Sequence, residues 1–249
     1  MDAEQKRLLA IFDRVRTRRP DEVDGAVAEL RAYVAGAPRA RSSIRARYML
    51  ASALVVRADL VGGSTGLQDL AEACGLLEDL WARRLITPPD RLVFGAALAE
   101  ARAKELTAWF DQVLPDLFAP MAATWEDSSP DIAIPDAGID AGGLIAALGD
   151  PDGTRAEYIR RSDRAEAAYT VAIRLARQVG SLARPQLAAL LTSLGGLARN
   201  RAQFIGESSG YDRAVETLRE AIMLGDGRPT ADLVYTQSEL VGSPGFRSS

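Results

Sequence analysis

The chain contains no histidine and only one cysteine in its 249 residues. Histidine is the commonest general base near neutral pH and a frequent zinc ligand, so its absence excludes Ser–His and Cys–His nucleophile pairs and histidine-based metal sites. A single cysteine, Cys74, excludes an internal disulfide framework and any metal site built from several cysteines. Because Cys74 lies near Ala71, Leu76 and Leu77 in a helical pattern, we interpret it as a buried, unreactive thiol.

Aromatic residues are also scarce, at 6% of the chain, whereas alanine and leucine are abundant. Alanine and leucine favour helices. Valine, isoleucine and threonine rarely alternate with polar residues at the period of two that is typical of strands. We therefore predict an all-α fold.

The net charge of −4 gives no general attraction to nucleic acid. No apolar run approaches the roughly 20 residues that span a bilayer. Residues 1–19 are charged throughout, so we expect no signal peptide. These features predict a cytoplasmic protein without a nucleic-acid or membrane partner.

Several motifs of helical enzymes and nucleotide-binding proteins are missing. The sequence has no Asp-Asp-x-x-Asp run of the terpene cyclase type, no Glu-x-x-His of di-iron bundles and no Gly-x4-Gly-Lys-Ser/Thr phosphate loop. We therefore predict no enzymatic activity, no cofactor and no metal site. The alternative is an all-helical enzyme or small-ligand-binding protein with a pocket between the two halves of the chain.

Apolar residues recur at helical spacing along most of the chain. Pro115 and Pro120 are expected to interrupt the helical pattern that follows residue 113. The predicted helices cover residues 3–18, 23–35, 39–60, 67–84, 90–109, 113–125, 155–179, 185–204, 211–224 and 230–240.

The segment Glu126–Gly153 differs in composition from the rest of the chain, with seven acidic residues, three prolines and no lysine or arginine. Its acidic residues do not fit the EF-hand spacing. We predict a long acidic connection, 126–154, between an N-terminal half (1–125) and a C-terminal half (155–241), with a flexible tail at 242–249. Docking of this connection against an arginine-rich face of the same chain is an alternative.

Two stretches that lie 143 residues apart, Ala51–Ala71 and Leu194–Ala214, have the same organisation. Each contains an apolar-periodic helix, a glycine-bearing break, an aspartate and a second apolar-periodic helix. At this offset the matched residues are Leu54 and Leu197, Gly63 and Gly206, Asp69 and Asp212, and Ala71 and Ala214. Because one helix pair cannot bury its apolar face alone, this repetition predicts an α-solenoid of stacked antiparallel pairs, with nine to eleven helices.

The later hairpin resembles the tetratricopeptide repeat. Leu194–Gly195 matches the Leu–Gly of the family's first helix. Ala214, Leu218 and Ala221 match the Ala-x3-aromatic-x2-Ala pattern of its second helix, with leucine in place of the aromatic residue. We expect a loop at 204–210 that is longer than the family's turn. Gly195 and Gly196 are expected to permit close helix packing.

The spacing Gly-x5-Asp-x-Ala, present at 63–71 and at 206–214, is similar to that of divergent actinobacterial repeats found beside CHAT protease domains. In the earlier copy, Gly75 occupies the position of the large residue. This resemblance implies a regulatory or scaffold role in effector assembly, with a CHAT-type protease or another effector as the protein partner. The oligomeric state is left open.

In tetratricopeptide repeats the first helix of each pair lines a concave groove. The resemblance therefore assigns Thr192, Arg199 and Asn200 to a partner-binding groove, with Arg57 matching Asn200 in the earlier copy. Arginine and asparagine at these positions can hold the carboxylate of a partner peptide. The alternative is that all four are solvated polar positions on amphipathic helices.

Overall fold

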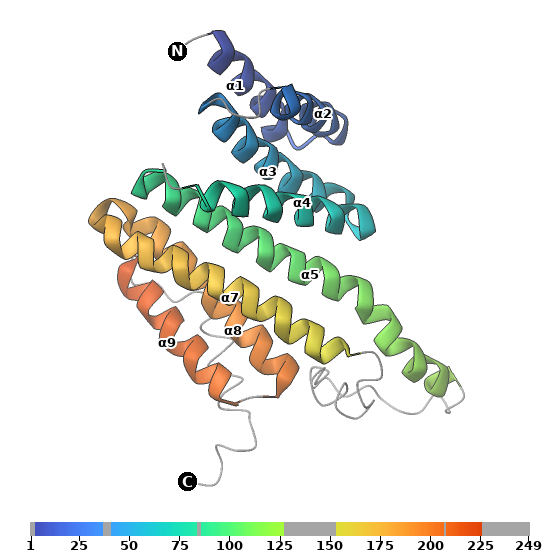
Figure 1. Ribbon diagram of the computed structural model, residues 1–249. Helices are drawn as coiled ribbons and strands as arrows, with labels where there is room; N and C mark the ends of the chain where they lie inside the picture. The colour runs from blue at the N-terminus through green and yellow to red at the C-terminus, as the bar shows by residue number, and fades with distance from the viewer. Residues whose placement is uncertain (1–2, 37–40, 84–85, 127–152, 207, 226–249) are drawn as a thin grey trace. The chain divides into compact units, whose positions relative to one another are not determined.

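The computed structural model describes residues 3–36, 41–83, 86–126, 153–206 and 208–225. Within these ranges the chain forms eight α-helices and one short 3-10 helix, and it contains no strand (Figure 1). The all-α prediction is therefore confirmed. The predicted helix at 230–240, the tail and nearly all of the acidic connection lie outside the described residues.

Over the described ranges the observed helices match the predicted ones in position, but they number eight α-helices rather than nine, because one helix covers the two predicted at 90–109 and 113–125. The observed helices are α1 (Ala3–Arg16), α2 (Pro20–Gly36), α3 (Arg41–Val61), α4 (Gly63–Trp81), α5 (Pro88–Glu126), α7 (Thr154–Val179), η1 (Gly180–Ala183), α8 (Arg184–Ile205) and α9 (Ser208–Leu224). The loop expected at 204–210 is wrong, since the helices on either side of it end at Ile205 and begin at Ser208.

The interruption expected near Pro115 and Pro120 is wrong, because α5 continues through both prolines to Glu126. A proline removes one backbone donor and crowds the carbonyl four residues earlier, which costs about 3 kcal/mol in a helix interior. Pro115 is exposed, so water can bond the carbonyl that loses its helical partner. The preceding turns of α5 are rich in alanine and leucine, which favour the helix.

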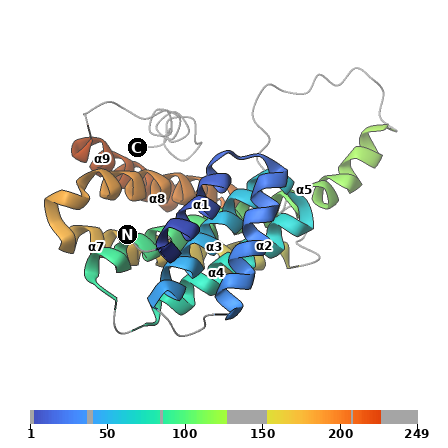
Figure 2. The same cartoon turned by 90° about the horizontal axis from the view of Figure 1, so that it is seen from above.

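Contacts within the chain divide it into two compact units, Met1–Trp109 (unit 1) and Phe110–Ser249 (unit 2). The division falls inside α5, which gives residues 88–109 to unit 1 and residues 110–126 to unit 2. In unit 1, α2 packs on α3 and α3 packs on α4, as Figures 1 and 2 show. In unit 2, α8 packs on both α7 and α9.

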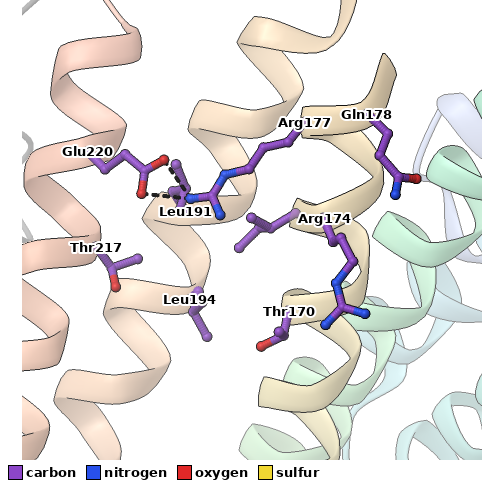
Figure 3. Close-up of a pocket in the computed structure, with 9 residues that line it drawn as sticks. Thr170, Arg174, Arg177, Gln178, Leu191, Leu194, Thr217 and Glu220 are labelled. Atoms are coloured by element: carbon purple, nitrogen blue, oxygen red, sulfur yellow. Dashed lines mark hydrogen bonds and ion pairs between the residues drawn. The ribbon is translucent and has the colours of Figure 1, made fainter. Parts of the chain in front are cut away.

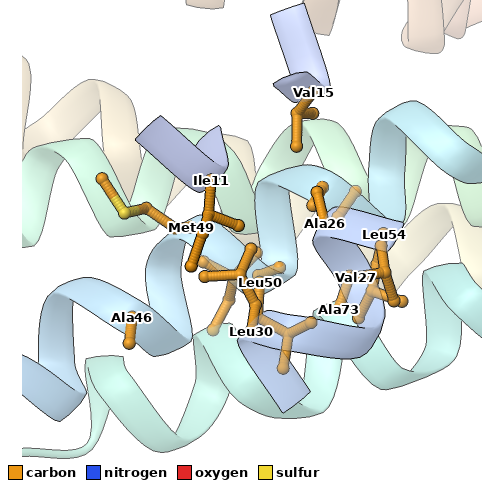
Figure 4. Close-up of a cluster of buried hydrophobic side chains, with 14 of the residues drawn as sticks. Ile11, Val15, Ala26, Val27, Leu30, Ala46, Met49, Leu50, Leu54 and Ala73 are labelled. Atoms are coloured by element: carbon orange, nitrogen blue, oxygen red, sulfur yellow. The ribbon is translucent and has the colours of Figure 1, made fainter. Parts of the chain in front are cut away.

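Unit 1 is held together by one apolar cluster that draws on α1, α2, α3, α4 and α5 (Figure 4). Leu30, Leu50, Leu54 and Leu77 are each no more than 2% exposed. Burying a leucine side chain of this kind contributes about 2 kcal/mol. The cluster also contains Cys74, which confirms that this thiol is buried. Burial, together with the nearby charge of Glu105, raises the pKa of the Cys74 thiol to about 12.

The two similar hairpins, α3–α4 and α8–α9, are related by an offset of 144 residues rather than the expected 143. Gly62 and Gly206 both have positive φ and each donates its N–H to the carbonyl four residues earlier, Ala58 or Ala202, at 2.9 and 2.8 Å. Four residues after each of these glycines a second glycine lies against the alanine of its own hairpin: Gly66 against Ala58, and Gly210 against Ala202. The 144 offset matches the residues that close the two hairpins. Over residues 51–71 it also gives five identical residues, against four at 143.

Unit 2 has an aromatic cluster in which Tyr158 packs on Phe204, with ring centroids 4.0 Å apart, and on Phe110 at 5.6 Å. Tyr158 is 4% exposed. Burial disfavours its phenolate and raises the pKa of Tyr158 to about 12, from an ordinary value of 10. This contact therefore joins α7, α8 and the second part of α5.

We expect unit 2 to lose stability as the pH rises from about 10 to about 12, since over this range Tyr158 is ionised in the unfolded chain but protonated in the folded one. The unfolded state then binds fewer protons, so the free energy of unfolding falls with pH. A 295 nm titration of the wild type minus that of Tyr158→Phe isolates this phenol. A midpoint near 10 in the difference titration would show that Tyr158 is solvated.

Among the described helices, none combines the length and the apolar character that a membrane-spanning segment requires.

Candidate functional site

A cleft of about 520 Å³ lies within unit 2, between α7 and α9, with α8 as its floor (Figure 3). Its volume is within the range of about 300–1,000 Å³ that is typical of ligand sites. The cleft exists because α7 and α9 both pack on α8, and side chains of α7 and α9 reach each other across it. It is open to solvent along the rim, where Arg174, Arg177 and Gln178 are exposed.

The floor of the cleft is apolar. Leu191 and Leu194 rise from α8, and Ile173 joins them from α7. Leu191 is 3% exposed and Ile173 is 5% exposed, so both are already packed against neighbouring helices. Leu194 is half-buried and faces the opening. A ligand that covers Leu194 would gain about 25 cal/mol for each Å² of apolar surface removed from water.

One end of the cleft is bridged by an ion pair between α7 and α9. The guanidinium Nη2 of Arg177 donates to both carboxylate oxygens of Glu220, at 2.6 and 2.9 Å. Both side chains are about half exposed, at 54% and 44%. Exposed pairs of this kind contribute no more than about 1 kcal/mol. Glu220 can therefore be displaced from Arg177 at little cost.

The second α7–α9 bridge lies two turns before Ile173 and is more deeply buried. Glu166, whose side chain is 12% exposed, pairs with Arg213 of α9 and with Arg201 of α8. Arg201 also donates to Asp163 of α7 at 2.5 Å. This network of two arginines and two carboxylates ties all three helices together. We assign it a structural role.

Two threonines face the cleft from opposite walls, and Figure 3 shows them on either side of Leu194. Thr170 Oγ1 donates to the carbonyl of Glu166, and Thr217 Oγ1 donates to the carbonyl of Arg213, each at 2.8 Å. Because each hydroxyl proton is already used within its own helix, what remains at each oxygen is its capacity to accept. The cleft walls therefore offer hydrogen-bond acceptors to a ligand.

Arg174 lies one turn before Arg177 on the cleft-facing side of α7. Its side chain is exposed and extends toward Thr170, away from Glu220 (Figure 3). Within the part of the chain that the structure describes, Arg174 has no ion-pair or hydrogen-bond partner. The cleft rim thus carries two arginines against one carboxylate, and its local charge is positive.

The structure places the predicted groove residues of α8 elsewhere on that helix. Thr192, Arg199 and Asn200 do not line the cleft between α7 and α9. Thr192 Oγ1 donates to the carbonyl of Ala188 at 3.0 Å, and the Arg199 guanidinium donates to Oδ1 of Asn200 at 2.9 and 3.1 Å. Their assignment to a partner-binding groove stays a prediction.

The fourth predicted residue, Arg57, is engaged in unit 1. Its Nε donates to Oδ2 of Asp69 at 2.6 Å, its Nη2 donates to Oδ1, and its Nη1 lies 3.5 Å from Asp24. Hydrogen bonding with Asp69 raises the pKa of Arg57 above its ordinary value. Asp69 is 3% exposed, so this is a buried fork-to-fork pair that holds α3 against α4.

At an offset of 143 Arg57 matches Asn200, but at 144 it matches Arg201. Both arginines bind an aspartate of the preceding helix, Asp24 in one case and Asp163 in the other. The residues of the cleft, above all Arg174, were missed because they come from three helices and only α8 and α9 belong to the repeated stretch. The signal that was available is the i, i+3 spacing of Arg174 and Arg177 beside Ile173.

Comparison with known proteins identifies no relative, since no family model matches the sequence and no curated protein matches it.

Proposed function

We propose that this protein is a non-enzymatic interaction module of the helical-repeat type, which binds a segment of a partner protein in the cleft between α7 and α9. The observation that carries the proposal is the form of the cleft: a solvent-open site with an apolar floor, acceptor walls and a positive rim. Such a combination suits a peptide, because a peptide segment offers apolar side chains, backbone N–H groups and charged groups close together.

The composition of the cleft favours binding over catalysis. Glu220 is the single carboxylate among the described lining residues, and it is held by Arg177. Acid–base catalysis of the usual kind pairs a general acid with a general base, and the described lining residues supply one carboxylate and no histidine, lysine, cysteine or tyrosine. The described residues also include no group of three or more carboxylates or thiols arranged to hold a metal ion.

The solenoid and tetratricopeptide-like interpretation belongs to this proposal. Its support is the equivalence of the hairpins α3–α4 and α8–α9, each closed by a positive-φ glycine that caps the first helix. We further propose a regulatory role for the protein, with a CHAT-type protease or another effector as its partner. The enzyme or ligand-binding alternative, with its pocket between the two halves, stays a prediction without an observation that favours it.

Site-specific photocrosslinking in the producing cells tests the proposed function. A photoreactive phenylalanine analogue at Thr217 places the crosslinker in the cleft, whereas the same analogue at Arg219 places it at an exposed residue of α9 that does not line the cleft. We expect discrete protein adducts from position 217 that are absent at position 219. Identical adduct patterns at both positions, or no protein adducts at 217, would refute the proposal.

A further inference from the structure

We infer that the cleft recognises an acidic residue flanked by aliphatic residues in the partner segment, and that Glu220 occupies the place of the partner's carboxylate until the partner binds. This inference rests on the proposed function and adds the chemistry of the ligand. It also makes Glu220 a competitor of the ligand.

The rim of the cleft is suited to bind a carboxylate. Arg177 already holds a carboxylate, since its Nη2 donates to both oxygens of Glu220. The pair is half exposed, so its net stabilisation is small and an incoming carboxylate can replace Glu220. Arg174, one turn away on the same wall, adds a second guanidinium that no described residue engages. Two arginines with one weakly held internal anion form a site for a further anion.

The floor of the cleft favours a ligand with an apolar part. Leu194 is half-buried, and Leu191 and Ile173 line the same cleft. An anion without an apolar body would leave this floor in contact with water. An aliphatic side chain next to the carboxylate would cover Leu194 and displace that water.

The walls of the cleft suit a peptide better than a free phosphate group. The hydroxyl oxygens of Thr170 and Thr217 can accept hydrogen bonds but have committed their protons to their own helices. A backbone N–H of a peptide can donate to them, whereas an ionised phosphate has no donor to offer. The walls, the floor and the rim therefore agree on one class of ligand, an acidic and aliphatic peptide segment.

Fluorescence polarisation with the full chain tests the inference. The probe is a pool of fluorescein-labelled nonapeptides with Glu or Asp at the centre, Leu, Ile or Val at the two positions on each side, and Gly or Ser elsewhere. Three matched pools replace the central acid with Gln or Asn, replace it with phosphoserine, or replace the aliphatic flanks with Gly and Ser. We expect the acidic and aliphatic pool to bind most tightly.

The variants give opposite expected changes. Arg174→Ala should weaken binding of the acidic pool about tenfold, because a charged hydrogen bond is lost. Glu220→Gln should strengthen it about fivefold, because the competing carboxylate is removed from Arg177. Arg164→Ala is the matched control, since Arg164 is an exposed arginine of α7 that does not line the cleft. It should leave the affinity unchanged.

Equal binding of the acidic and amide pools would overturn the inference, as would tighter binding of the phosphoserine pool or no binding by any pool. An Arg174→Ala effect no larger than that of Arg164→Ala, or weaker binding by Glu220→Gln, would also overturn it. Photocrosslinking at Thr217 detects a protein partner of any chemistry. If adducts form at Thr217 but the peptides do not bind as expected, only the proposed ligand class is refuted. If no adducts form, the proposed function is refuted.

Discussion

Replacing Asp69 with asparagine is expected to lower the free energy of unfolding of unit 1 by about 3 kcal/mol. Asp69 lies 3% exposed on α4 and receives two hydrogen bonds from Arg57 of α3. The amide of asparagine has one acceptor oxygen and no charge, so the Arg57 guanidinium would remain in a partly buried place without its counter-charge. Arg31 of α2, which lies 3.7 Å from the same carboxylate, would lose part of its compensation too.

The matched control for Asp69→Asn is Asp212→Asn. Sequence alignment at an offset of 143 pairs these two aspartates, but Asp212 is exposed on α9. Its substitution should change the free energy of unfolding by no more than about 0.5 kcal/mol. Urea denaturation followed by circular dichroism measures both effects. Equal and small effects at the two positions would mean that the Arg57–Asp69 pair contributes no more than a solvated surface pair.

Replacing both members of the Arg57–Asp69 pair separates the net contribution of the pair from the cost of leaving one charge unpaired. When Arg57→Met is combined with Asp69→Leu, no buried charge is left without a partner. The double variant should therefore be more stable than Asp69→Asn, even though it lacks the ion pair. A double variant that is less stable would show that the two hydrogen bonds of the pair outweigh the cost of desolvating its charges.

The helices were predictable from local patterns, because the apolar periodicity and the boundary residues of each helix lie within or next to that helix. Leu30 on α2 and Leu50 and Leu54 on α3 recur at helical spacing, and all three are buried in the core of unit 1. Glycine at the end of α8 and proline at the start of α5 are ordinary helix boundaries. The continuation of α5 through Pro115 was not predictable from these patterns, because it depends on whether water can reach the carbonyl that loses its helical partner.

The cleft was not predictable in the same way, because it depends on distances between helices. The sequence shows that Arg174 and Arg177 share a face of α7, but not that Glu220 of α9 lies across from Arg177. The role of Arg57 was equally inaccessible. Its pairing with Asp69, twelve residues later, requires the tight turn at Gly62 that brings α4 back along α3. The equivalence of Arg57 with Arg201, by contrast, was accessible from the sequence, since an offset of 144 gives five identical residues over positions 51–71 and an offset of 143 gives four.

Replacing Gly195 with alanine is expected to destabilise unit 2 by about 2 kcal/mol, although alanine favours a helix. A Cβ atom at residue 195 would lie 2.5 Å from Cγ of Leu218 on α9. Leu218 is 0% exposed, so its branched carbon has no space into which it can move. The close approach of α8 to α9 would have to open, and Ala214, whose carbonyl oxygen would lie 3.4 Å from the new Cβ, would move with Leu218.

The neighbouring residue provides the control for Gly195→Ala. A Cβ atom at Gly196 would meet nothing within 4 Å, so Gly196→Ala should stabilise α8 by about 1 kcal/mol through helix propensity alone. Thermal denaturation of the two variants should thus shift the midpoint in opposite directions. Combining Gly195→Ala with Leu218→Ala should remove the clash but leave a cavity, so the double variant should lose less stability than the sum of the single losses. If alanine stabilised the protein at both positions, there would be room for a Cβ atom between α8 and α9. Gly195 would then not set the distance between the two helices.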